Sequence, residues 1–231
     1  MKHFPEKAVS ITAKTGFLTK EFWEEFIFQG GSKRWKNVSW KALQDRGYFM
    51  PYPNSRVKNV LVLNRYNKNV ISAVQSVAAK APSISQFTHD EVLLRGIMTA
   101  ERAGSLTKWM TEAELKMHGK TTFLIQSQGD YIKYPDAVVA CKDTSKEYLA
   151  AIELEMTLKS RKRYVQILSA YAAMKHIRSI IFICKDLAIE RAIKEMMDHV
   201  YFPTKQISVT FVTLNQWRQQ SVNVLKDAIP T

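Results

Sequence analysis

The sequence is poor in cysteine, glycine and proline, and it has no long apolar run. Its 231 residues include two cysteines, 8 glycines and 7 prolines. Two thiols exclude a disulfide framework, and each follows an apolar run, so we expect Cys141 and Cys184 to be buried and free. No stretch approaches the ~18 apolar residues of a membrane span, and the first residues lack the apolar core of a secretory signal. We therefore expect a cytoplasmic protein with no membrane partner.

Negative charge is scarce in the first third of the chain. The whole sequence has 34 Lys+Arg and 21 Asp+Glu, a net charge of +13. Residues 1–80 hold 14 basic and 5 acidic residues (net +9), and residues 81–231 hold 20 and 16 (net +4). Such an excess points to a polyanionic partner, usually nucleic acid. We expect a DNA-binding domain over residues 1–81 and a second domain over 82–231, separated near Pro82.

The basic domain has the element order of a winged helix. Three segments have helical patterns with clear ends: residues 5–14, 19–29 and 33–46. Thr19 and Ser32 are good N-caps for the second and third. Two short strands around a polar turn follow within residues 48–63, which predicts a hairpin. Residues 67–81 are expected to form a connecting helix.

Basic side chains gather on the third helix and at the hairpin turn. We expect phosphate and base contacts with DNA from Lys33, Arg34, Lys36, Lys41, Arg56 and Lys58. Val38, Leu43 and one tryptophan of this helix are expected to face inward. A small helical domain with a solvated basic face is the alternative.

Carboxylates follow a different pattern in the second domain. Residues 134–141 and 147–156 are expected to pair as strands, and the period of two places Glu153 and Glu155 on one face. Two carboxylates on an apolar strand are costly to desolvate unless a cation balances them. Asp136 opens the first strand and could meet them at one end of the sheet. Three oxygen ligands there predict a Mg²⁺ or Mn²⁺ site.

The rest of the second domain alternates helices and strands. The pattern predicts a helix over residues 87–103 and a strand over residues 121–127 before these two paired strands. After them it predicts a helix from residue 160 onward, and then a strand–helix–strand–helix run over residues 177–184, 186–199, 207–214 and 215–226. Residues 177–184 are apolar throughout, as in a central strand. We therefore expect an α/β (α+β) fold with a mixed central sheet flanked by helices. The start of the helix after Lys159 carries Arg161, Lys162 and Arg163, which we expect to contact DNA phosphate.

The ordered set Pro135-Asp136, Glu153-Leu154-Glu155 and Lys159 resembles the PD-(D/E)xK nuclease motif in its ExE form, with the lysine displaced to the following helix. Together with a winged helix and His89-Asp90, residues 10–185 resemble the replication-relaxation group of plasmid proteins, which includes MobC-type mobilisation relaxases. The resemblance implies a restriction-endonuclease-like core and a metal-dependent DNA endonuclease. It favours a site-directed nickase or relaxase-like protein of plasmid, phage or mobile-element DNA.

The same resemblance implies roles for individual residues. Asp136 and Glu153 correspond to metal ligands, with Glu112 or Glu114 as the additional upstream acid. Glu155 takes the place of the usual lysine, and Lys159 substitutes for that lysine. His89 matches a histidine near the start of the family's core.

Other interpretations of these residues stay open. Glu153 and Glu155 could serve only in salt bridges with the basic residues that follow them. Tyr164 and Tyr171 fit packing against the sheet better than the covalent nucleophile of a tyrosine relaxase. The alternative for the protein as a whole is a non-catalytic replication initiator or repressor with a degenerate nuclease fold. A homodimer is a further expectation for either interpretation.

Overall fold

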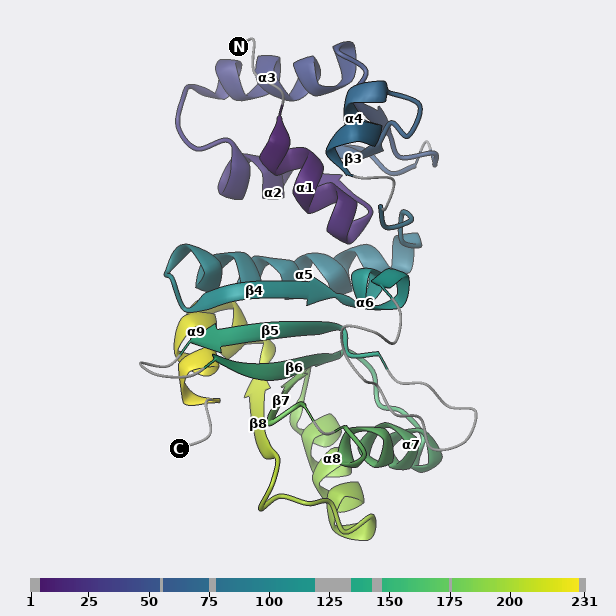
Figure 1. Ribbon diagram of the computed structural model, residues 1–231, viewed down its shortest axis with the longest axis vertical. Helices are drawn as coiled ribbons and strands as arrows, with labels where there is room; N and C mark the ends of the chain where they lie inside the picture. The colour runs from purple at the N-terminus through teal and green to yellow at the C-terminus, as the bar shows by residue number, and fades with distance from the viewer. Residues whose placement is uncertain are drawn as a thin grey trace. The chain divides into compact units, whose positions relative to one another are not determined.

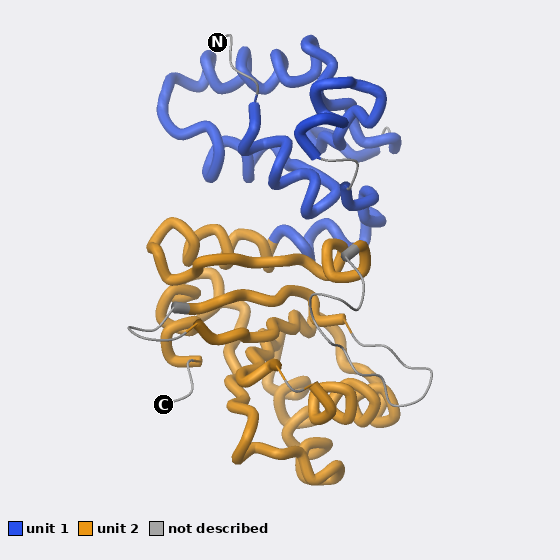
Figure 2. Tube along the Cα trace, viewed as in Figure 1, with its two compact units in different colours: residues 1–91 blue, residues 92–231 orange. Residues whose placement is uncertain are grey.

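A computed structural model describes most of the chain in two compact units. The described residues are 5–54, 56–74, 78–118, 134–142, 147–174 and 176–228. Unit 1 comprises Met1–Glu91 and unit 2 comprises Val92–Thr231 (Figure 2). No helix within the described ranges is long and apolar enough to cross a membrane.

The division between the units falls inside helix α5, Ile84–Arg102 (Figure 1). It therefore lies beyond the boundary expected near Pro82. The first part of α5 belongs to unit 1 because the ring of Phe87 packs 5.1 Å from that of Phe17 and 4.9 Å from that of Tyr52. The assignment of separate functions to the two parts stays a prediction.

Unit 1 combines short helices with a small antiparallel sheet of strand order β1-β3-β2. Its elements are α1 (Glu6–Thr15), β1 (Leu18–Thr19), α2 (Lys20–Phe22), the π-helix η1 (Trp23–Ile27), α3 (Lys33–Asp45), β2 (Phe49–Pro51), β3 (Val60–Leu63) and α4 (Lys68–Ala73). Both expected caps are present: the Phe22 N–H donates to Thr19 Oγ1 at 3.1 Å, and the Trp35 N–H donates to Ser32 Oγ at 3.3 Å. The expected β2–β3 hairpin is confirmed.

Two segments of unit 1 differ from the expected helices. The second helix widens into η1, whose last turn is closed by a 2.8 Å hydrogen bond from Phe28 N–H to Trp23 O and by stacking of the two rings. The connecting helix ends at Ala73, and farther along the chain the Ala79 N–H bonds to the carbonyl of Ala13 of α1. That contact needs Gly16, since a Cβ there would lie 2.1 Å from the carbonyl oxygen of Lys80.

Unit 2 is a mixed five-stranded sheet flanked by helices, as expected (Figure 1). Its elements after α5 are β4 (Leu106–Thr111), α6 (Glu112–His118), β5 (Ala137–Lys142), β6 (Glu147–Glu155), α7 (Arg161–Ala172), β7 (Ser179–Cys184), α8 (Leu187–His199), β8 (Ser208–Thr213) and α9 (Leu214–Asp227). The strand order is β4-β5-β6-β7-β8. The pairs β4–β5 and β5–β6 are antiparallel, and β6–β7 and β7–β8 are parallel.

The sequence pattern accounts for most of this sheet. Strand β7 is buried at every position and lies between two parallel neighbours, as expected for a central strand. Strand β4 was not predicted, and the strand expected over residues 121–127 lies outside the described residues. Cys141 and Cys184 are free and buried, also as expected.

An apolar core of unit 2 lies between the sheet and helices α7 and α8. Ala151 of β6 and Phe182 of β7 belong to this cluster with Leu168 of α7 and Ile193 of α8. Because side chains alternate along a strand, the residues of β6 that follow Ala151 at intervals of two share this face. These residues are Glu153 and Glu155.

Candidate active site

The two glutamates of β6 lie in the interior of unit 2. Glu153 and Glu155 each expose 1% of their surface. Strand β6 has hydrogen-bonded neighbours on both sides and a helix-covered face, which accounts for this burial. A buried carboxylate is costly unless hydrogen bonds or a cation compensate its charge. The structure supplies a different donor to each of them.

Glu153 is held by a tyrosine of the neighbouring helix. The hydroxyl of Tyr171, on α7, donates a hydrogen bond to Glu153 Oε1. Tyr171 is itself fully buried. Burial raises the pKa of Tyr171 well above its usual range, and the negative charge of Glu153 raises it further. The hydroxyl is therefore protonated at neutral pH and acts as a donor.

The burial of both tyrosines of α7 disfavours the nucleophile interpretation. Tyr164 exposes 1% of its surface, and burial raises its pKa to about 12. Its oxygen accepts a hydrogen bond from the backbone N–H of Lys159 at 3.3 Å. A covalent nucleophile needs access to the phosphodiester and an activated hydroxyl, and neither tyrosine has these in this arrangement.

Glu155 is paired with the lysine that follows it by four residues. The ammonium of Lys159 forms an ion pair and hydrogen bond with Glu155 Oε2. The Lys159 side chain is one-third exposed, whereas that of Glu155 is buried. Ser160 then caps α7 by accepting a hydrogen bond from the Arg163 N–H. Lys159 thus lies at the end of β6, with its ammonium on the buried carboxylate of Glu155.

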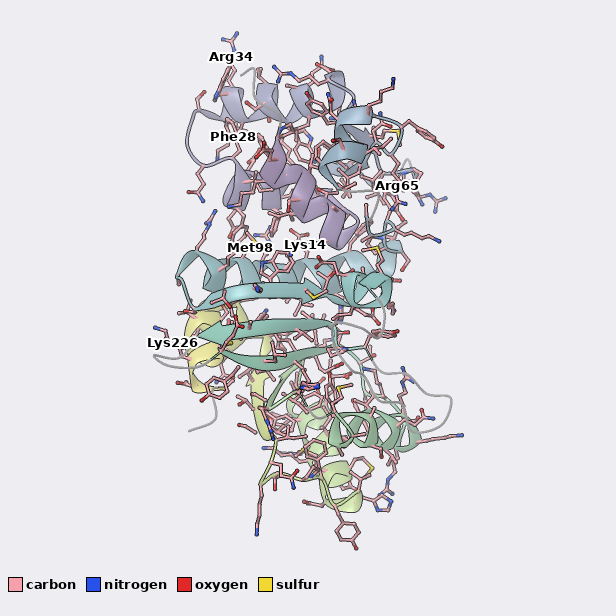
Figure 3. All side chains as sticks on the ribbon, viewed as in Figure 1. Lys14, Phe28, Arg34, Arg65, Met98 and Lys226 are labelled. Carbon is pink, nitrogen blue, oxygen red and sulfur yellow. The ribbon has the colours of Figure 1, made fainter. Side chains whose placement is uncertain are left out.

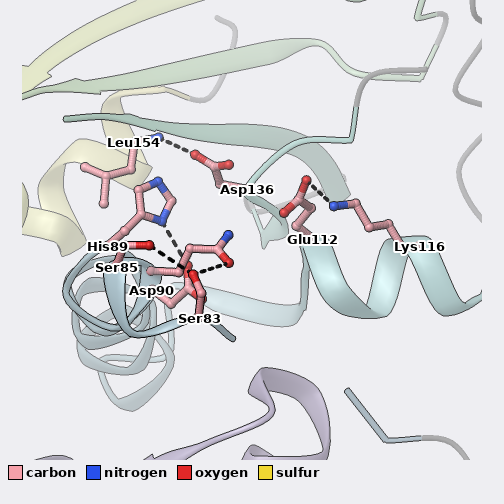
Figure 4. Close-up of polar contacts among 9 residues, drawn as sticks. Ser83, Ser85, His89, Asp90, Glu112, Lys116, Asp136 and Leu154 are labelled. Carbon is pink, nitrogen blue, oxygen red and sulfur yellow. Dashed lines mark hydrogen bonds and ion pairs between the residues drawn. The ribbon is translucent and has the colours of Figure 1, made fainter. Parts of the chain in front are cut away.

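Asp136 lies beside this pair of glutamates, just before β5. Its Oδ2 accepts a hydrogen bond from the backbone N–H of Leu154 at 2.7 Å (Figure 4). The register places Ala137 opposite Ile152, so the preceding Asp136 comes next to Glu153. The sequence-based expectation that Asp136 approaches the Glu153–Glu155 segment agrees with this contact.

The expected convergence of the three carboxylates on one metal ion is not present in this arrangement. Within the described ranges, no group of three or more His, Cys, Asp or Glu side chains is positioned to hold a metal ion. The carboxylates of Asp136, Glu153 and Glu155 bond instead to a backbone N–H, a hydroxyl and an ammonium. Their chemistry still suits Mg²⁺ or Mn²⁺, which prefer oxygen ligands.

Glu112 and Glu114, the two candidates for the additional acid, make different contacts. Glu114 and Thr111 form a reciprocal cap at the start of α6: Glu114 Oε2 accepts from the Thr111 N–H at 3.1 Å, and Thr111 Oγ1 accepts from the Glu114 N–H at 3.3 Å. Glu112 forms an ion pair of 2.7 Å with Lys116 (Figure 4). The Glu112 N–H also bonds to the backbone carbonyl of Asp136 at 2.9 Å. Glu112 therefore adjoins the Asp136 segment through the backbone, whereas the carboxylate of Glu114 caps a helix.

His89 belongs to unit 1, on the first part of α5. Its Nδ1 lies 2.9 Å from Asp90 Oδ1 (Figure 4). A neighbouring carboxylate orients the imidazole in this way, which fits a packing role as well as a catalytic one. The predicted role of His89 stays a prediction.

Helix α3 exposes much of its basic surface. Lys33, Arg34 and Lys41 are exposed, Lys36 is half-buried, and Arg56 and Lys58 are exposed at the hairpin. The Arg34 side chain extends away from the body of unit 1 (Figure 3). Trp40 and Leu43 face inward as expected, but Val38 does not, because it is 49% exposed. Trp35, 45% exposed, completes a surface of mixed basic and apolar character that the sequence did not single out.

The basic start of α7 is only partly available for phosphate. Arg161, Lys162 and Arg163 are all exposed. Arg161 Nη2, however, lies 3.0 Å from Glu195 Oε1 of α8, in an exposed ion pair. Such exposed pairs contribute little to stability and are screened by salt.

Comparisons with known proteins add little to this geometry. No family model matches the chain, and no curated protein matches it. Among solved structures, the chain is similar to the restriction endonuclease FokI bound to DNA, with 10% sequence identity and a TM-score of 0.31. The similarity covers 98% of this chain and 45% of that one, so the chain spans less than half the length of the solved protein. A TM-score of this size does not establish a shared fold.

Proposed function

We propose that the protein is a metal-dependent DNA endonuclease, a site-directed nickase or relaxase-like enzyme of plasmid, phage or mobile-element DNA. The observation that carries the proposal is the burial of Glu153 and Glu155 on β6 with Asp136 fixed beside them. Carboxylates in a protein interior lower stability, and such groups cluster at functional sites. The mixed sheet supplies the rigid support that a catalytic site needs.

In this proposal Asp136 and Glu153 hold the cation, with Glu112 as a further ligand. Bound Mg²⁺ or Mn²⁺ supplies charge neutralisation of the scissile phosphate and activation of water. Lys159 contributes positive charge at the solvent end of the site, where charge develops on the phosphodiester. Glu155 keeps Lys159 in place through their ion pair.

DNA binding is assigned to unit 1. Its helices α1, α2–η1 and α3 and the sheet order β1-β3-β2 support a winged-helix interpretation. In that arrangement α3 enters the major groove and the β2–β3 hairpin contacts the flanking backbone. The net charge of +9 over residues 1–80, from 14 basic and 5 acidic residues, favours a polyanionic partner. Arg161, Lys162 and Arg163 would contact the strand near the cleavage site.

A second candidate function is DNA binding without cleavage, as in a replication initiator or repressor. The observation that favours it is the engagement of Glu153 by Tyr171 and of Glu155 by Lys159, with no metal-ligand group among the described residues. A cytoplasmic location and a homodimer, both expectations from the sequence, are compatible with both functions.

One experiment separates the two functions. Supercoiled plasmid is incubated with the full-length protein in Mg²⁺, Mn²⁺ or EDTA, and the topological forms are separated by gel electrophoresis. A nickase converts supercoiled plasmid to open circles only with the cation, and Glu153→Gln abolishes this conversion while DNA binding in a gel-shift assay is retained. If plasmids that the wild-type protein binds stay supercoiled with every cation, the binding-protein function replaces the nuclease.

A further inference from the structure

The exposed side of α3 carries two large apolar side chains that the core of unit 1 does not use. Trp40 and Leu43 face inward and are buried, and the Trp40 ring packs 5.6 Å from that of Trp23. Trp35 and Val38 instead expose 45% and 49% of their surface. Residues three apart in a helix are neighbours, so these two side chains lie next to each other. We call Trp35 and Val38 the apolar stripe of α3.

The tryptophan of the stripe is held by the turn that precedes the helix. A Cβ on Gly31, whose φ is +82°, would lie 2.9 Å from Cδ1 of the Trp35 ring. The ring therefore lies directly against the backbone of this turn. The backbone N–H of Trp35 also donates to Ser32 Oγ in the helix cap. A side chain that is already ordered loses less conformational entropy when it binds a partner.

Positive charge borders the stripe. Four basic residues of α3 precede its first acidic residue, Asp45, in the sequence: Lys33, Arg34, Lys36 and Lys41. Arg34 and Lys41 stand four residues before and three residues after Val38, so both share its side of the helix. An apolar side chain between cations matches the major groove of duplex DNA, where the C5-methyl group of thymine lies between two phosphate backbones. A purely apolar partner would leave the charges of these side chains without compensation.

We propose that the apolar stripe of α3 recognises thymine, by packing against the C5-methyl groups that T·A pairs expose in the major groove of duplex DNA. Arg34 and Lys41 contact phosphates on either side of the stripe. Apolar contact with this methyl group is a means by which proteins distinguish thymine from the other bases. The inference rests on the proposed function, in which α3 enters the major groove, and it adds the base that is recognised.

The test removes the methyl group from the DNA and keeps every hydrogen-bonding group of the base. Duplexes that the full-length protein selects from a random pool, in EDTA to prevent metal-dependent cleavage, are resynthesised with deoxyuridine in place of thymidine at one position at a time. Fluorescence anisotropy then measures the affinity for each duplex. We expect deoxyuridine to weaken binding about 3- to 5-fold at one or more positions of the selected site, the loss that corresponds to one buried methyl group.

Two variants connect the methyl group to the stripe. Val38→Ala truncates an exposed side chain and introduces a better helix former, so the fold should be retained. We expect it to bind the thymidine duplex about 3- to 10-fold more weakly than wild type, and the deoxyuridine duplex within about twofold of wild type, because the methyl group and the side chain act as a pair. Trp35→Ala, at the other end of the stripe, tests the same coupling with a second side chain.

Ile71→Ala is the matched control. Ile71 is a β-branched residue of α4 in the same unit and is 44% exposed. We expect its affinity for the thymidine duplex to stay within about twofold of wild type, and its response to deoxyuridine to equal that of wild type.

Three results overturn the recognition of thymine by the stripe. The first is a wild-type affinity that deoxyuridine changes at no position. The second is a loss in Val38→Ala that is equal on the two duplexes. The third is full DNA affinity in both stripe variants, which would leave the stripe to a partner protein. A folded wild-type protein with no affinity for duplex DNA overturns the proposed DNA-binding function itself, which is a different result from binding that is insensitive to the methyl group.

Discussion

The carboxylate of Asp136 accepts a hydrogen bond from the backbone N–H of Leu154, with 2.7 Å between Oδ2 and N. Leu154 stands between Glu153 and Glu155 in the sequence, so this one bond fixes Asp136 beside both buried glutamates. Asp136 thereby has two separable properties, a negative charge and a hydrogen-bond acceptor. Substitutions can remove the charge alone or both together.

Asp136→Asn removes only the charge, because the amide oxygen still accepts from Leu154. We expect its nicking rate to fall at least about 100-fold while its free energy of unfolding is unchanged or slightly higher, since repulsion with the glutamates is relieved. Asp136→Ala also leaves the Leu154 N–H unsatisfied and should cost about 1–3 kcal/mol more in urea unfolding. Equal stability of the two variants would show that the hydrogen bond has no structural role.

The Glu155–Lys159 pair predicts that a second substitution reverses most of the stability loss caused by the first. Lys159→Met leaves Glu155, which is 1% exposed, without its ammonium partner. We expect a loss of about 1–3 kcal/mol, below the ~3–5 kcal/mol of a fully buried pair because Lys159 is partly exposed. Adding Glu155→Gln should recover most of that loss. Urea unfolding of the four members of this double-mutant cycle measures the coupling, and an additive result contradicts the pairing.

The sequence predicted the site's strands well but not what surrounds its carboxylates. Alternation along β6 correctly placed Glu153 and Glu155 on one face, because a strand's period is strict. Tyr171 was assigned to packing, since a tyrosine on the core-facing stripe of a helix has the same pattern whether or not its hydroxyl binds a carboxylate. The acceptor role of Asp136 also escaped prediction because its partner is a backbone N–H, which carries no sequence signal.

Interactions that leave no regular sequence pattern explain where the observed fold differs from the expected one. Strand β4 carries Lys108 between Leu106 and Trp109, and the register shift there interrupts the alternation that identifies strands. In unit 1, residues 78–80 lie within the helix expected over residues 67–81, but the Ala79 N–H forms a backbone hydrogen bond with the carbonyl of Ala13 in place of a local helical bond. Such tertiary contacts cannot be predicted from helical periodicity.

A glycine of α5 should be indispensable for packing in unit 2. A Cβ at Gly96 would lie 2.2 Å from Cε2 of Trp217, whose ring is fully buried and whose Nε1–H donates to the carbonyl of Val92 at 3.1 Å. We expect Gly96→Ala to lower the free energy of unfolding by about 1–3 kcal/mol, although alanine favours helices. Thr99→Ala, at an exposed position of the same helix, is the control and should change it by less than about 0.5 kcal/mol. A stabilised Gly96→Ala protein would contradict this packing.

The buried thiols predict a loss of stability at alkaline pH. Burial raises the pKa of Cys141 from 9.0 to about 11 and that of Cys184 from 9.0 to about 12. Because the folded-state values are the higher ones, their contribution is complete below pH 9 and is lost as the pH rises toward 11 to 12. Each thiol ionised only in the unfolded state lowers the free energy of unfolding by about 1.4 kcal/mol per pH unit. Chemical unfolding between pH 8 and 11, with Cys141→Ala and Cys184→Ala for comparison, measures this slope, which each substitution should reduce.

The basic surface of α3 predicts a change in the salt dependence of DNA binding. Lys33→Gln, Arg34→Gln and Lys36→Gln together remove three cations from the helix proposed to enter the major groove. Because each phosphate contact releases counterions, the slope of log affinity against log salt should become shallower by about 2–3. The measurement is fluorescence anisotropy with duplex DNA and the full-length protein over a range of salt concentrations.

The control for this experiment makes the same change of charge on unit 2. Lys205, Arg218 and Lys226 are exposed and lie outside the proposed contacts, so their replacement by glutamine alters net charge equally. A general electrostatic attraction would make the two triple variants equal in slope and affinity. If α3 contacts DNA directly, the slope of log affinity against log salt becomes shallower in the α3 variant and stays close to wild type in the unit 2 variant. Only ions displaced at the contact surface contribute to this salt dependence. Equal losses would therefore remove α3 from the proposed DNA interface.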